Sequence, residues 1–443
     1  MSTVILSAAG PEFVSLQKLA ALLEAELRQS GETDIRLFEL SATKLAYCQG
    51  EFDCWVKTPG RCRAHDAEGA ILSAIHDAAH LVVLDAVTFG GHSYTLKRAQ
   101  DRLICLLSPF FEKRASLTHH KARYERTANF FALGWMPVAD LDAMETWCAL
   151  ADANALNLLA PLAGAAVVDD TGEADWPTAI RSMLASTATP GSTIVGRASL
   201  RRDLIEAATG APGLTELGHP RRAAIVVGSA KIKGTSASET MARALGARLV
   251  AAGVATEIHF ATEFLHDEKA LATARGLANA DLLVLVTPLY VDSFPALATR
   301  ALENVARVRA GTPAAGRFAV LVNCGFPEPE HNRTALRIAR HFARRSGYEW
   351  AGGLPLGGGA AIDPMVPLDA QHGPAEHVKR ALDLAAECLA NGRPISLEAV
   401  ETMAKSPLPD SIYRFMGDFG WRYQAYKNGL AQTALLARPL DNL

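Results

Sequence analysis

The chain has 443 residues, of which 49% are hydrophobic and 21% charged, and a formal net charge of −3. A chain of this length usually forms two domains, and this composition predicts that both are globular and well packed. The small net charge and the lack of a Lys/Arg block argue against nucleic acid or an anionic membrane as the main partner. We expect a cytoplasmic protein, because the sequence shows no secretory signal and no apolar run of roughly 20 residues.

The first predicted domain spans residues 1–168. Apolar strands are expected at 4–6, 79–84 and 162–168, and amphipathic helices at 16–23 and 96–102. Strands that alternate with helices are typical of α/β domains with a parallel sheet. Residues 169–221 are predicted to form a connector, in which short helical stretches at 176–184 and 198–208 lie among turn-forming residues.

The second predicted domain spans residues 222–395 and shows the same alternation more fully. Strands are expected near 223–227, 255–260, 282–286, 317–323 and 350–356, and helices near 237–252, 268–277, 294–309 and 332–346. Five apolar strands separated by helices predict a doubly wound parallel sheet that is covered on both faces. Ligands bind such sheets beyond the carboxyl ends of the strands, where the strand order reverses.

The last segment, residues 396–443, is a tail with a high density of aromatic side chains. Its large apolar residues include Ile412, Phe415, Phe419, Trp421 and Tyr423. So many apolar side chains are rarely left in water, so the tail is expected to pack on the domains.

The two predicted domains are similar to each other, which indicates a tandem duplication. In each, a strand leads into a small-residue loop and a helix, at Ser7 in the first domain and at Gly228 in the second. A later strand again ends in a polar loop before a helix, at Asp85 and at Thr287. The offset between the copies is 221 residues at the first loop and 202 at the second. Insertions in surface loops explain a drift of this size.

The loop over residues 228–238 is a candidate phosphate site. It offers hydroxyl groups, the cations of Lys231 and Lys233, and backbone amides at the start of a helix. Such amides and the positive end of the helix dipole favour an anion. Thr235 follows Gly234 where an ATP-binding loop would have lysine, and the glycine order of a dinucleotide turn is missing. A plain βα turn with a serine cap is the structural alternative.

With the loop that follows residues 282–286, this segment resembles the flavodoxin-like NAD(P)H-dependent FMN reductases. The resemblance rests on Gly228-Ser-Ala-Lys231, Gly234-Thr-Ser-Ala-Ser238 and Thr287-Pro-Leu-Tyr290. It implies that the FMN phosphate is bound by Ser229, Lys231, Thr235, Ser236 and Ser238. It further implies that the flavin ring is flanked by Thr287, Pro288, Leu289 and Tyr290, and contacted by a third loop with Asn323, Cys324 and Gly325. Lys231 replaces the arginine that is usual in this family. The positive charge is kept, but the several N–H donors of a planar guanidinium group are lost.

The first domain carries a cysteine run with Cys48, Cys54 and Cys62, then the segments 88–93, 101–102 and 119–124. With these motifs it resembles a branch of the same superfamily, but its flavin site is expected to be eroded. Its phosphate loop starts at Ser7 and places Glu12 where an anion would lie, and Asp85-Ala86 stands where Thr-Pro is expected. Repulsion between a carboxylate and a phosphate weakens binding.

The seven cysteines are expected to be thiols, because an odd number spread over a long chain is unlike a disulfide scaffold. Cys48, Cys54 and Cys62 leave an iron–sulfur cluster or zinc as alternatives, although no fourth cysteine is close in sequence and no metal site is predicted. His119-His120, predicted in a polar loop, could be a ligand pair or a proton donor, or could contact backbone or a neighbouring subunit.

The resemblance implies a flavin-dependent oxidoreductase in which FMN accepts hydride from NAD(P)H and passes electrons to an unidentified small-molecule or protein acceptor. The chemistry is the cofactor's, so no side chain is nominated as an acid or base. Two other functions stay open: a non-catalytic flavodoxin-like scaffold that binds a partner, and an electron carrier without a nucleotide site. We also expect the two domains to pair as an internal pseudo-dimer, in which the 88–93 loop or the 119–124 segment closes over the flavin, with further homo-oligomers possible.

Overall fold

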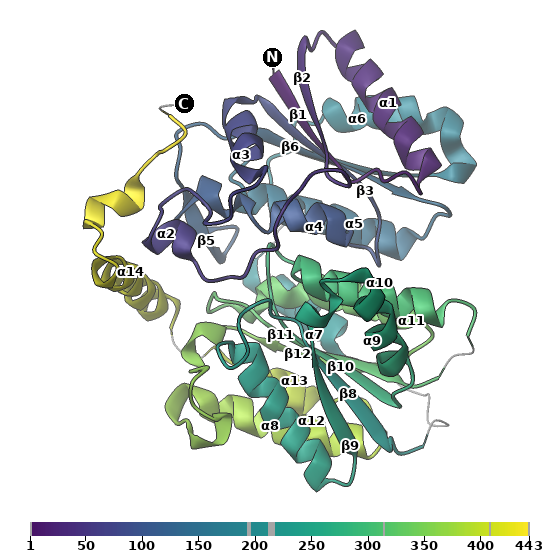
Figure 1. Cartoon of the computed structure of the whole chain (residues 1–443), viewed down its shortest axis with the longest axis vertical. Helices are drawn as coiled ribbons and strands as arrows, with labels where there is room; N and C mark the ends of the chain where they lie inside the picture. Colours follow the sequence, from purple (N-terminus) through teal and green to yellow (C-terminus); the bar gives the residue numbers. More distant parts are fainter. Residues whose placement is uncertain (1, 193–195, 211–217, 313–314, 407–408, 442–443) are drawn as a thin grey trace. The chain divides into compact units, whose positions relative to one another are not determined.

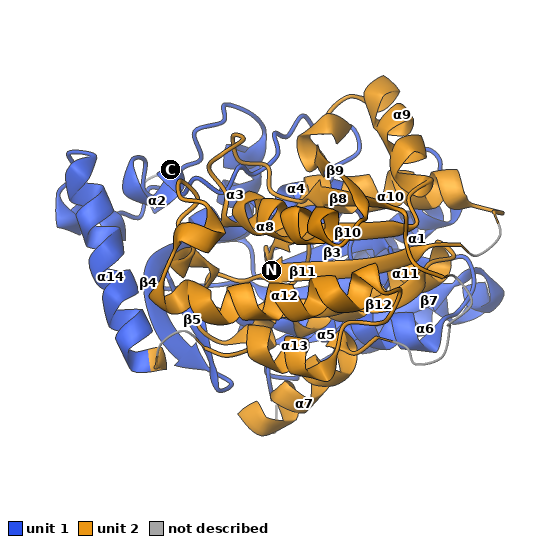
Figure 2. Cartoon of the chain, turned by 90° about the horizontal axis from the view of Figure 1, so that it is seen from below, with its two compact units in different colours: residues 1–194, 411–443 blue, residues 195–410 orange. Residues whose placement is uncertain are grey.

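The computed structural model describes residues 2–192, 196–210, 218–312, 315–406 and 409–441. Two compact units are present, shown in blue and orange in Figure 2. Unit one consists of residues 1–194 and 411–443, and unit two of residues 195–410. The expected boundaries at 168, 221 and 395 therefore differ from the observed division. The predicted connector is split between the units, because its two helices pack on different sheets, and the predicted tail is split as well.

Unit one contains a parallel five-stranded sheet in the order β2-β1-β3-β6-β7 (Figure 1). Its strands are β1 (Ser2–Ser7), β2 (Asp34–Glu39), β3 (His80–Ala86), β6 (Asn129–Met136) and β7 (Ala163–Asp169). Its helices are α1 (Val14–Gln29), α2 (Asp53–Val56), α3 (Glu68–Asp77), α4 (Tyr94–Gln100), α5 (Leu141–Asn157) and α6 (Trp176–Leu184). Along β1, Ile5 enters the core under α1 and α6, whereas Val4 and Leu6 enter the core under α3 and α5. Alternation along the strand thus buries both faces of the sheet.

An antiparallel hairpin of β4 (Leu107–Arg114) and β5 (Leu117–Ala122) also belongs to unit one. It was not predicted, because its turn residues Ala115 and Ser116 both adopt positive φ angles, 45° and 69°, without the Asn-Gly or Gly signal of such turns. His119 and His120 therefore lie in a strand, and the expectation of a polar loop there was wrong. The Nδ1 atom of His119 lies 2.8 Å from the Asn157 side-chain oxygen.

Unit two contains a second parallel five-stranded sheet, in the order β12-β11-β10-β8-β9. Its strands are β8 (Arg222–Val227), β9 (Ala255–Phe260), β10 (Leu282–Pro288), β11 (Arg317–Asn323) and β12 (Glu349–Leu356). Its helices are α7 (Arg197–Ala208), α8 (Ala237–Ala251), α9 (Asp267–Ala278), α10 (Ala296–Arg309), α11 (Arg333–Arg345), α12 (Glu376–Ala390) and α13 (Leu397–Met403). All five strands predicted here are present. Both sheets have the flavodoxin-like order, so the predicted fold class is confirmed.

The strand pairing fixes how the two copies correspond. The Ala8 amide donates to the Leu84 carbonyl at 2.8 Å, and the Gly228 amide donates to the Val286 carbonyl at 2.8 Å. Ala8 thus takes the place of Gly228, and the offset at the first loop is 220 residues, not the expected 221. The offset of 202 at the second loop is confirmed, because the turns over residues 88–91 and 290–293 each close in an isolated bridge.

Helix α14 (Asp410–Lys427) contains all five of the apolar residues named above for the predicted tail. Trp421 packs as expected, with its ring centroid 5.2 Å from that of Phe52 and 5.1 Å from that of Trp55. The expectation was wrong for the other four tail residues, whose exposed fractions lie between 48% and 75%. A helix packs against a neighbouring surface along one side only. Apolar side chains that are distributed around the whole helix therefore cannot all be buried by a single packing contact. Among the described residues, no helix is long and apolar enough to cross a membrane.

Candidate functional site

Three loops of unit two leave the carboxyl ends of neighbouring parallel strands. They cover residues 228–236 after β8, residues 287–295, which begin with the last two residues of β10, and residues 323–332, which begin with the last residue of β11. Because β8, β10 and β11 are adjacent and parallel, these loops meet at one edge of the sheet. All twelve residues predicted for the flavin site lie in these loops or in the first turn of α8.

The first loop approaches the second so closely that a side chain at Gly228 has no room. A Cβ atom at this position would lie 2.4 Å from Thr287 Oγ1 and 2.6 Å from Thr287 Cβ. Thr287 is itself fully buried, so it cannot move aside easily. Glycine at position 228 therefore lets the backbone of the first loop lie directly against Thr287, at the end of β10.

The hydroxyl groups predicted for this loop have different environments. Ser236 caps α8, because its Oγ accepts from the Glu239 amide at 3.2 Å. Ser229 is buried, and its Oγ accepts from the Lys231 amide at 3.3 Å. Thr235 turns back into its own loop and donates to the Ile232 carbonyl at 2.6 Å.

The two lysines of the loop also differ. Lys233 places its Nζ 4.1 Å from the centre of the Phe260 ring, in a cation–π contact. Lys231 is half-buried. Lys231 follows the buried Ser229 by two residues, whereas the ammonium group of Lys233 is turned to Phe260.

Glu239 is a residue of this site that the sequence interpretation missed. Its carboxylate accepts from the Gly234 amide at 2.5 Å and pairs with Arg243 at 2.7 Å. Glu239 is almost fully buried, so its charge is placed beside the loop but is matched by the guanidinium. The spacing Ser236-x-x-Glu239 is that of a capping box and could have indicated it.

The second loop presents three half-buried residues, Pro288, Leu289 and Tyr290, after the buried Thr287. The Thr287 Oγ1 donates to the Pro288 carbonyl at 3.1 Å. Val291 and Asp292 then adopt positive φ angles, 50° and 57°, in a tight turn closed between Tyr290 and Ser293. The turn holds residues 288–290 at the sheet edge with part of each side chain accessible.

Asn323 joins the three loops. Its Nδ2 donates to Ser238 Oγ at 2.9 Å and to the Thr287 carbonyl at 3.0 Å. Its backbone carbonyl accepts from the Leu289 amide at 2.8 Å. Ser238 and Asn323 were both predicted as cofactor contacts, and the structure engages their side chains with each other.

Cys324 is buried, and its Sγ donates to the Phe326 carbonyl at 3.2 Å and to the Glu328 carbonyl at 3.4 Å. Burial raises the pKa of this thiol well above its ordinary value, and nearby Glu328 adds to the rise. Cys324 therefore stays protonated and orders the third loop. The neighbouring Gly325 is exposed, and a Cβ atom there would meet nothing within 4 Å.

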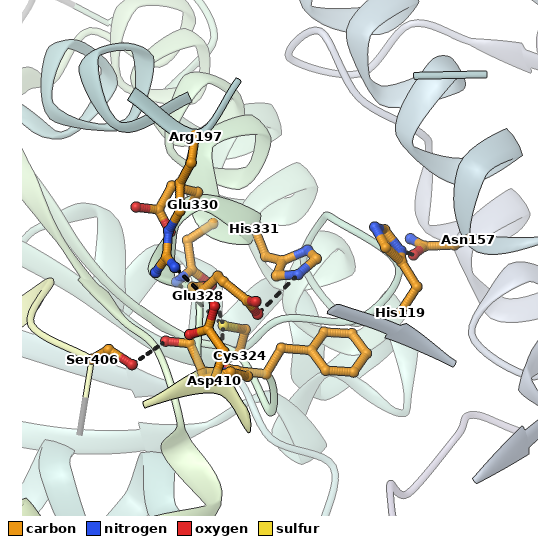
Figure 3. A network of polar contacts seen from close by, with 12 residues as sticks. His119, Asn157, Arg197, Cys324, Glu328, Glu330, His331, Ser406 and Asp410 are labelled. Atoms are coloured by element: carbon orange, nitrogen blue, oxygen red, sulfur yellow. Dashed lines mark hydrogen bonds and ion pairs between the residues drawn. The ribbon is translucent and has the colours of Figure 1, made fainter. Parts of the chain in front are cut away.

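A polar network lies behind the third loop (Figure 3). His331 places Nδ1 3.8 Å from the Asp292 carboxylate and Nε2 3.9 Å from that of Glu328. Arg197, at the start of α7, contacts Glu330 at 3.5 Å and Asp410 at 3.0 Å. The sequence interpretation missed this network, because α7 was assigned to a connector and these residues are distant along the chain. The contacts fasten the third loop to α7.

The corresponding loops of unit one have different chemistry. Helix α1 starts after Phe13, which makes no side-chain cap, and the loop between Ala8 and Phe13 is three residues shorter than that between Gly228 and Ser236. Trp135 stands in the register position of Asn323, since it pairs with Ala86 as Asn323 pairs with Pro288. The indole of Trp135 donates to Asp170 at 2.8 Å.

Asp85 takes the place of Thr287 and is fully buried. Its carboxylate accepts from the Ser93 amide at 2.7 Å and from the Ser93 hydroxyl at 2.6 Å. His92 lies beside it, with Nδ1 3.8 Å from Asp85 and Nε2 3.3 Å from the Asn154 side-chain oxygen. Burial raises the pKa of Asp85 to about 7, although the Ser93 hydrogen bonds lower it. Burial also lowers the pKa of His92 to about 3, and Lys97 contributes to that lowering. Both charges are disfavoured, so the pair is neutral near pH 6.

The cysteines of unit one are free thiols. The Cys105 Sγ donates to Glu68 Oε1 at 3.3 Å. A hydrogen bond with Cys54 and burial raise the pKa of Cys105, and burial raises those of Cys48 and Cys62. Within the described part of the chain, no three His, Cys, Asp or Glu side chains are grouped closely enough to hold a metal ion.

Comparison with known proteins gives one family match, to the NADPH-dependent FMN reductase family over residues 221–343. Among solved structures, the chain is similar to an azoreductase from Bacillus anthracis str. Sterne, with 17% identity, 39% of this chain and 99% of that chain covered, and a TM-score of 0.28. It is similar to the NAD(P)H:quinone oxidoreductase from Methanothermobacter marburgensis, with 18% identity, 39% and 96% covered, and a TM-score of 0.30. It is also similar to the flavodoxin of Streptococcus pneumonia TIGR4, with 19% identity, 38% and 97% covered, and a TM-score of 0.27. No curated protein sequence matches significantly.

Proposed function

Because residues 221–343 belong to the NADPH-dependent FMN reductase family, we propose that the chain is a flavin-dependent oxidoreductase with FMN bound to unit two. When bound, the flavin would accept a hydride from NAD(P)H and release electrons to a small-molecule or protein acceptor. The observation that supports this most directly is the meeting of the three loops at the carboxyl edge of the sheet, joined through Asn323. The cytoplasmic location and the internal pseudo-dimer remain predictions.

The first loop suits a phosphate group. Gly228 gives the backbone a close approach, and Ser229, Lys231 and the start of α8 supply hydroxyl, cation and amide donors. Glu239 does not oppose an anion there, because its carboxylate is paired with Arg243. Thr235 would act indirectly, since its hydroxyl group already donates to the Ile232 carbonyl. Ser238 accepts from Asn323 and would still have its hydroxyl hydrogen to donate.

The second loop suits the flavin ring. Pro288, Leu289 and Tyr290 offer partly accessible apolar surface, and the Leu289 amide is held by the Asn323 carbonyl. Thr287 and Asn323 would position this loop, and Gly325 would leave space at the third. Cys324 would take no part in electron transfer, because its thiol stays protonated and bonded to the loop.

Lys231→Ala is expected to weaken FMN binding about tenfold or more, because a charge-assisted hydrogen bond contributes roughly 1.5 to 3 kcal/mol. Titration of the protein with FMN, followed by quenching of flavin fluorescence, gives the dissociation constant. Lys233→Ala is the matched control in the same loop and should have the smaller effect, since Lys233 lies over Phe260. An equal effect of the two variants, or none, would contradict the assignment of Lys231.

Unit one is proposed not to bind flavin, so we expect one FMN per chain. In unit one, Ala9 follows Ala8 where Ser229 follows Gly228, the helix lacks a side-chain cap, and Asp85 replaces Thr287. The protein is saturated with FMN, the bound flavin is released by heat, and its absorbance gives the molar ratio of flavin to protein. A ratio of two, or a ratio of one that persists when Ser229 and Lys231 are both changed to alanine, would show that unit one holds flavin.

Reduction of the bound flavin separates the enzyme from an electron carrier. Anaerobic addition of NADPH or NADH to the holoprotein should bleach the flavin absorbance. Bound flavin that neither nucleotide reduces would favour the electron carrier, and a protein that binds no flavin would favour the scaffold.

A further inference from the structure

Helix α14 presents a row of large apolar side chains to solvent. The row consists of Ile412, Phe415, Met416, Phe419, Tyr423 and Tyr426, whose exposed fractions lie between 48% and 75%. We call Ile412, Met416, Phe419, Tyr423 and Tyr426 the seam. The rings of Phe419 and Tyr423 lie nearly parallel, 8° apart, with centroids 6.4 Å from each other. These neighbours therefore share one side of the helix.

The other side of α14 is already occupied within unit one. A Cβ atom at Gly417 would lie 2.3 Å from the Phe111 ring, so the helix backbone lies directly against β4. Trp421 packs on Phe52 and Trp55, as described above. Ala425 is fully buried with Phe110 and Leu435. One side of α14 is thus packed on unit one, and the seam lies on the side of the helix that is exposed.

The spacing of the seam indicates what would cover it. Its residues follow one another at intervals of four, three, four and three, an average of 3.5 residues. This period keeps a narrow row facing a second helix over two heptads. A helix that lies in a membrane surface usually has a broader apolar face and a strongly basic polar face. The spacing of the seam therefore favours a second helix as the partner that covers it.

The order of residues along the seam points to a second copy of α14 in antiparallel orientation. The seam is centred on Phe419, with Ile412 seven residues before it and Tyr426 seven residues after it. An antiparallel copy would set the aliphatic end, with Ile412 and Met416, against the aromatic end, with Tyr423 and Tyr426. A symmetric dimer needs this kind of self-complementary patch.

Charge favours the same orientation. Lys427 ends α14, and its Nζ lies 5.5 Å from the centre of the Tyr423 ring in the seam. Parallel pairing would bring the two Lys427 cations together, whereas antiparallel pairing separates them and also opposes the two helix dipoles. We propose that α14 pairs with α14 of a second copy of this chain, antiparallel and centred on Phe419. This pairing does not depend on the proposed function.

The proposed contact is small. A helix of 18 residues is about 27 Å long, and stable dimers usually bury about 800 Å² on each partner. One helix pair provides less than this, so we expect a reversible dimer with a dissociation constant in the micromolar range.

Sedimentation velocity of the full chain over a range of concentrations tests the association. The wild type should shift from monomer to dimer with rising concentration, and Phe419→Glu should raise the dissociation constant at least about tenfold. Leu141→Glu is the control, because Leu141 is also exposed, at 79%, and lies on α5 of the same unit. Circular dichroism checks that each variant is folded. Phe415→Ser, which changes an exposed side chain beside the seam, is a second and milder variant for comparison with Phe419→Glu. A wild type that stays monomeric up to several hundred micromolar, or a dimer that Phe419→Glu leaves intact, would overturn the proposal.

Disulfide trapping tests the orientation. In a Cys148→Ser background, which removes an exposed thiol, Phe419→Cys should form a covalent dimer under mild oxidation. Ile412→Cys alone should not, but mixed with Tyr426→Cys it should cross-link. Cross-linking of Ile412→Cys with itself would indicate parallel pairing and overturn the proposed arrangement. Binding of the wild type, but not of Phe419→Glu, to anionic lipid vesicles without any dimer would identify a membrane as the occupant instead.

Discussion

Gly228→Ala is expected to abolish measurable FMN binding and to destabilise unit two by about 1 to 3 kcal/mol, the usual cost of overpacking a close contact. The new methyl group would lie 2.4 Å from Thr287 Oγ1, 2.6 Å from Thr287 Cβ and 3.1 Å from Ala298 Cβ. Thr287 is buried at the end of β10 and bonded to Asn323 through its carbonyl. Relief of the clash must therefore displace the loop with Pro288, Leu289 and Tyr290, against which the flavin ring is proposed to lie.

The duplication provides the control for this experiment. Ala8 occupies the same position in unit one, where the carboxylate that replaces the threonine is held by Ser93. Ala8→Gly should leave FMN affinity unchanged and cost at most about 1 kcal/mol. FMN titration and urea unfolding followed by circular dichroism measure both quantities. Wild-type FMN affinity in Gly228→Ala would mean that the first loop is not the phosphate site.

The buried pair Asp85 and His92 is expected to produce two opposite pH dependences that cancel in the wild type. Asp85, with its pKa raised from 3.8 to about 7, keeps a proton in the folded state that the unfolded chain has released. Its contribution to stability therefore falls as pH rises from about 4 to about 7. His92, with its pKa lowered from 6.5 to about 3, lacks a proton that the unfolded chain binds. Its contribution rises with pH from about 3 to about 6.5.

Single substitutions should expose each dependence. As pH rises from about 4 to 6.5, the free energy of unfolding of His92→Gln should fall relative to that of wild type. That of Asp85→Asn should rise relative to wild type over the same range. Each slope should reach up to about 1.4 kcal/mol per pH unit. Five of the six tryptophans lie in unit one, so urea unfolding followed by tryptophan fluorescence reports mainly on this unit. Subtracting the wild-type free energy of unfolding from that of the variant at each pH cancels the contribution of all other titrating groups. Parallel pH profiles for wild type and both variants would show that the pair is ionised, as a salt bridge, in the folded protein.

Local sequence patterns were sufficient for the five strands of unit two and for its helices α7 to α11, whereas helices α12 and α13 were not predicted. Each apolar strand and each amphipathic helix predicted there is present, because burial on both faces of a parallel sheet requires continuous apolar strands. The loops at the carboxyl ends of β8, β10 and β11 follow from the same pattern. The hairpin β4-β5 did not follow, since its turn residues Ala115 and Ser116 adopt a conformation that their side chains do not favour.

The sequence by itself determined two tandem flavodoxin-like sheets and the position of the loops at which we propose that a flavin binds. Only the tertiary structure decided how the side chains in those loops are used. Asn323 bonds to Ser238, 85 residues away, and Arg197 bonds to Asp410, 213 residues away. It also decided that one side of α14 is buried and the other exposed. The physical reason is that periodicity reports the burial of a segment, whereas a hydrogen bond or a packed face depends on which distant segment arrives beside it.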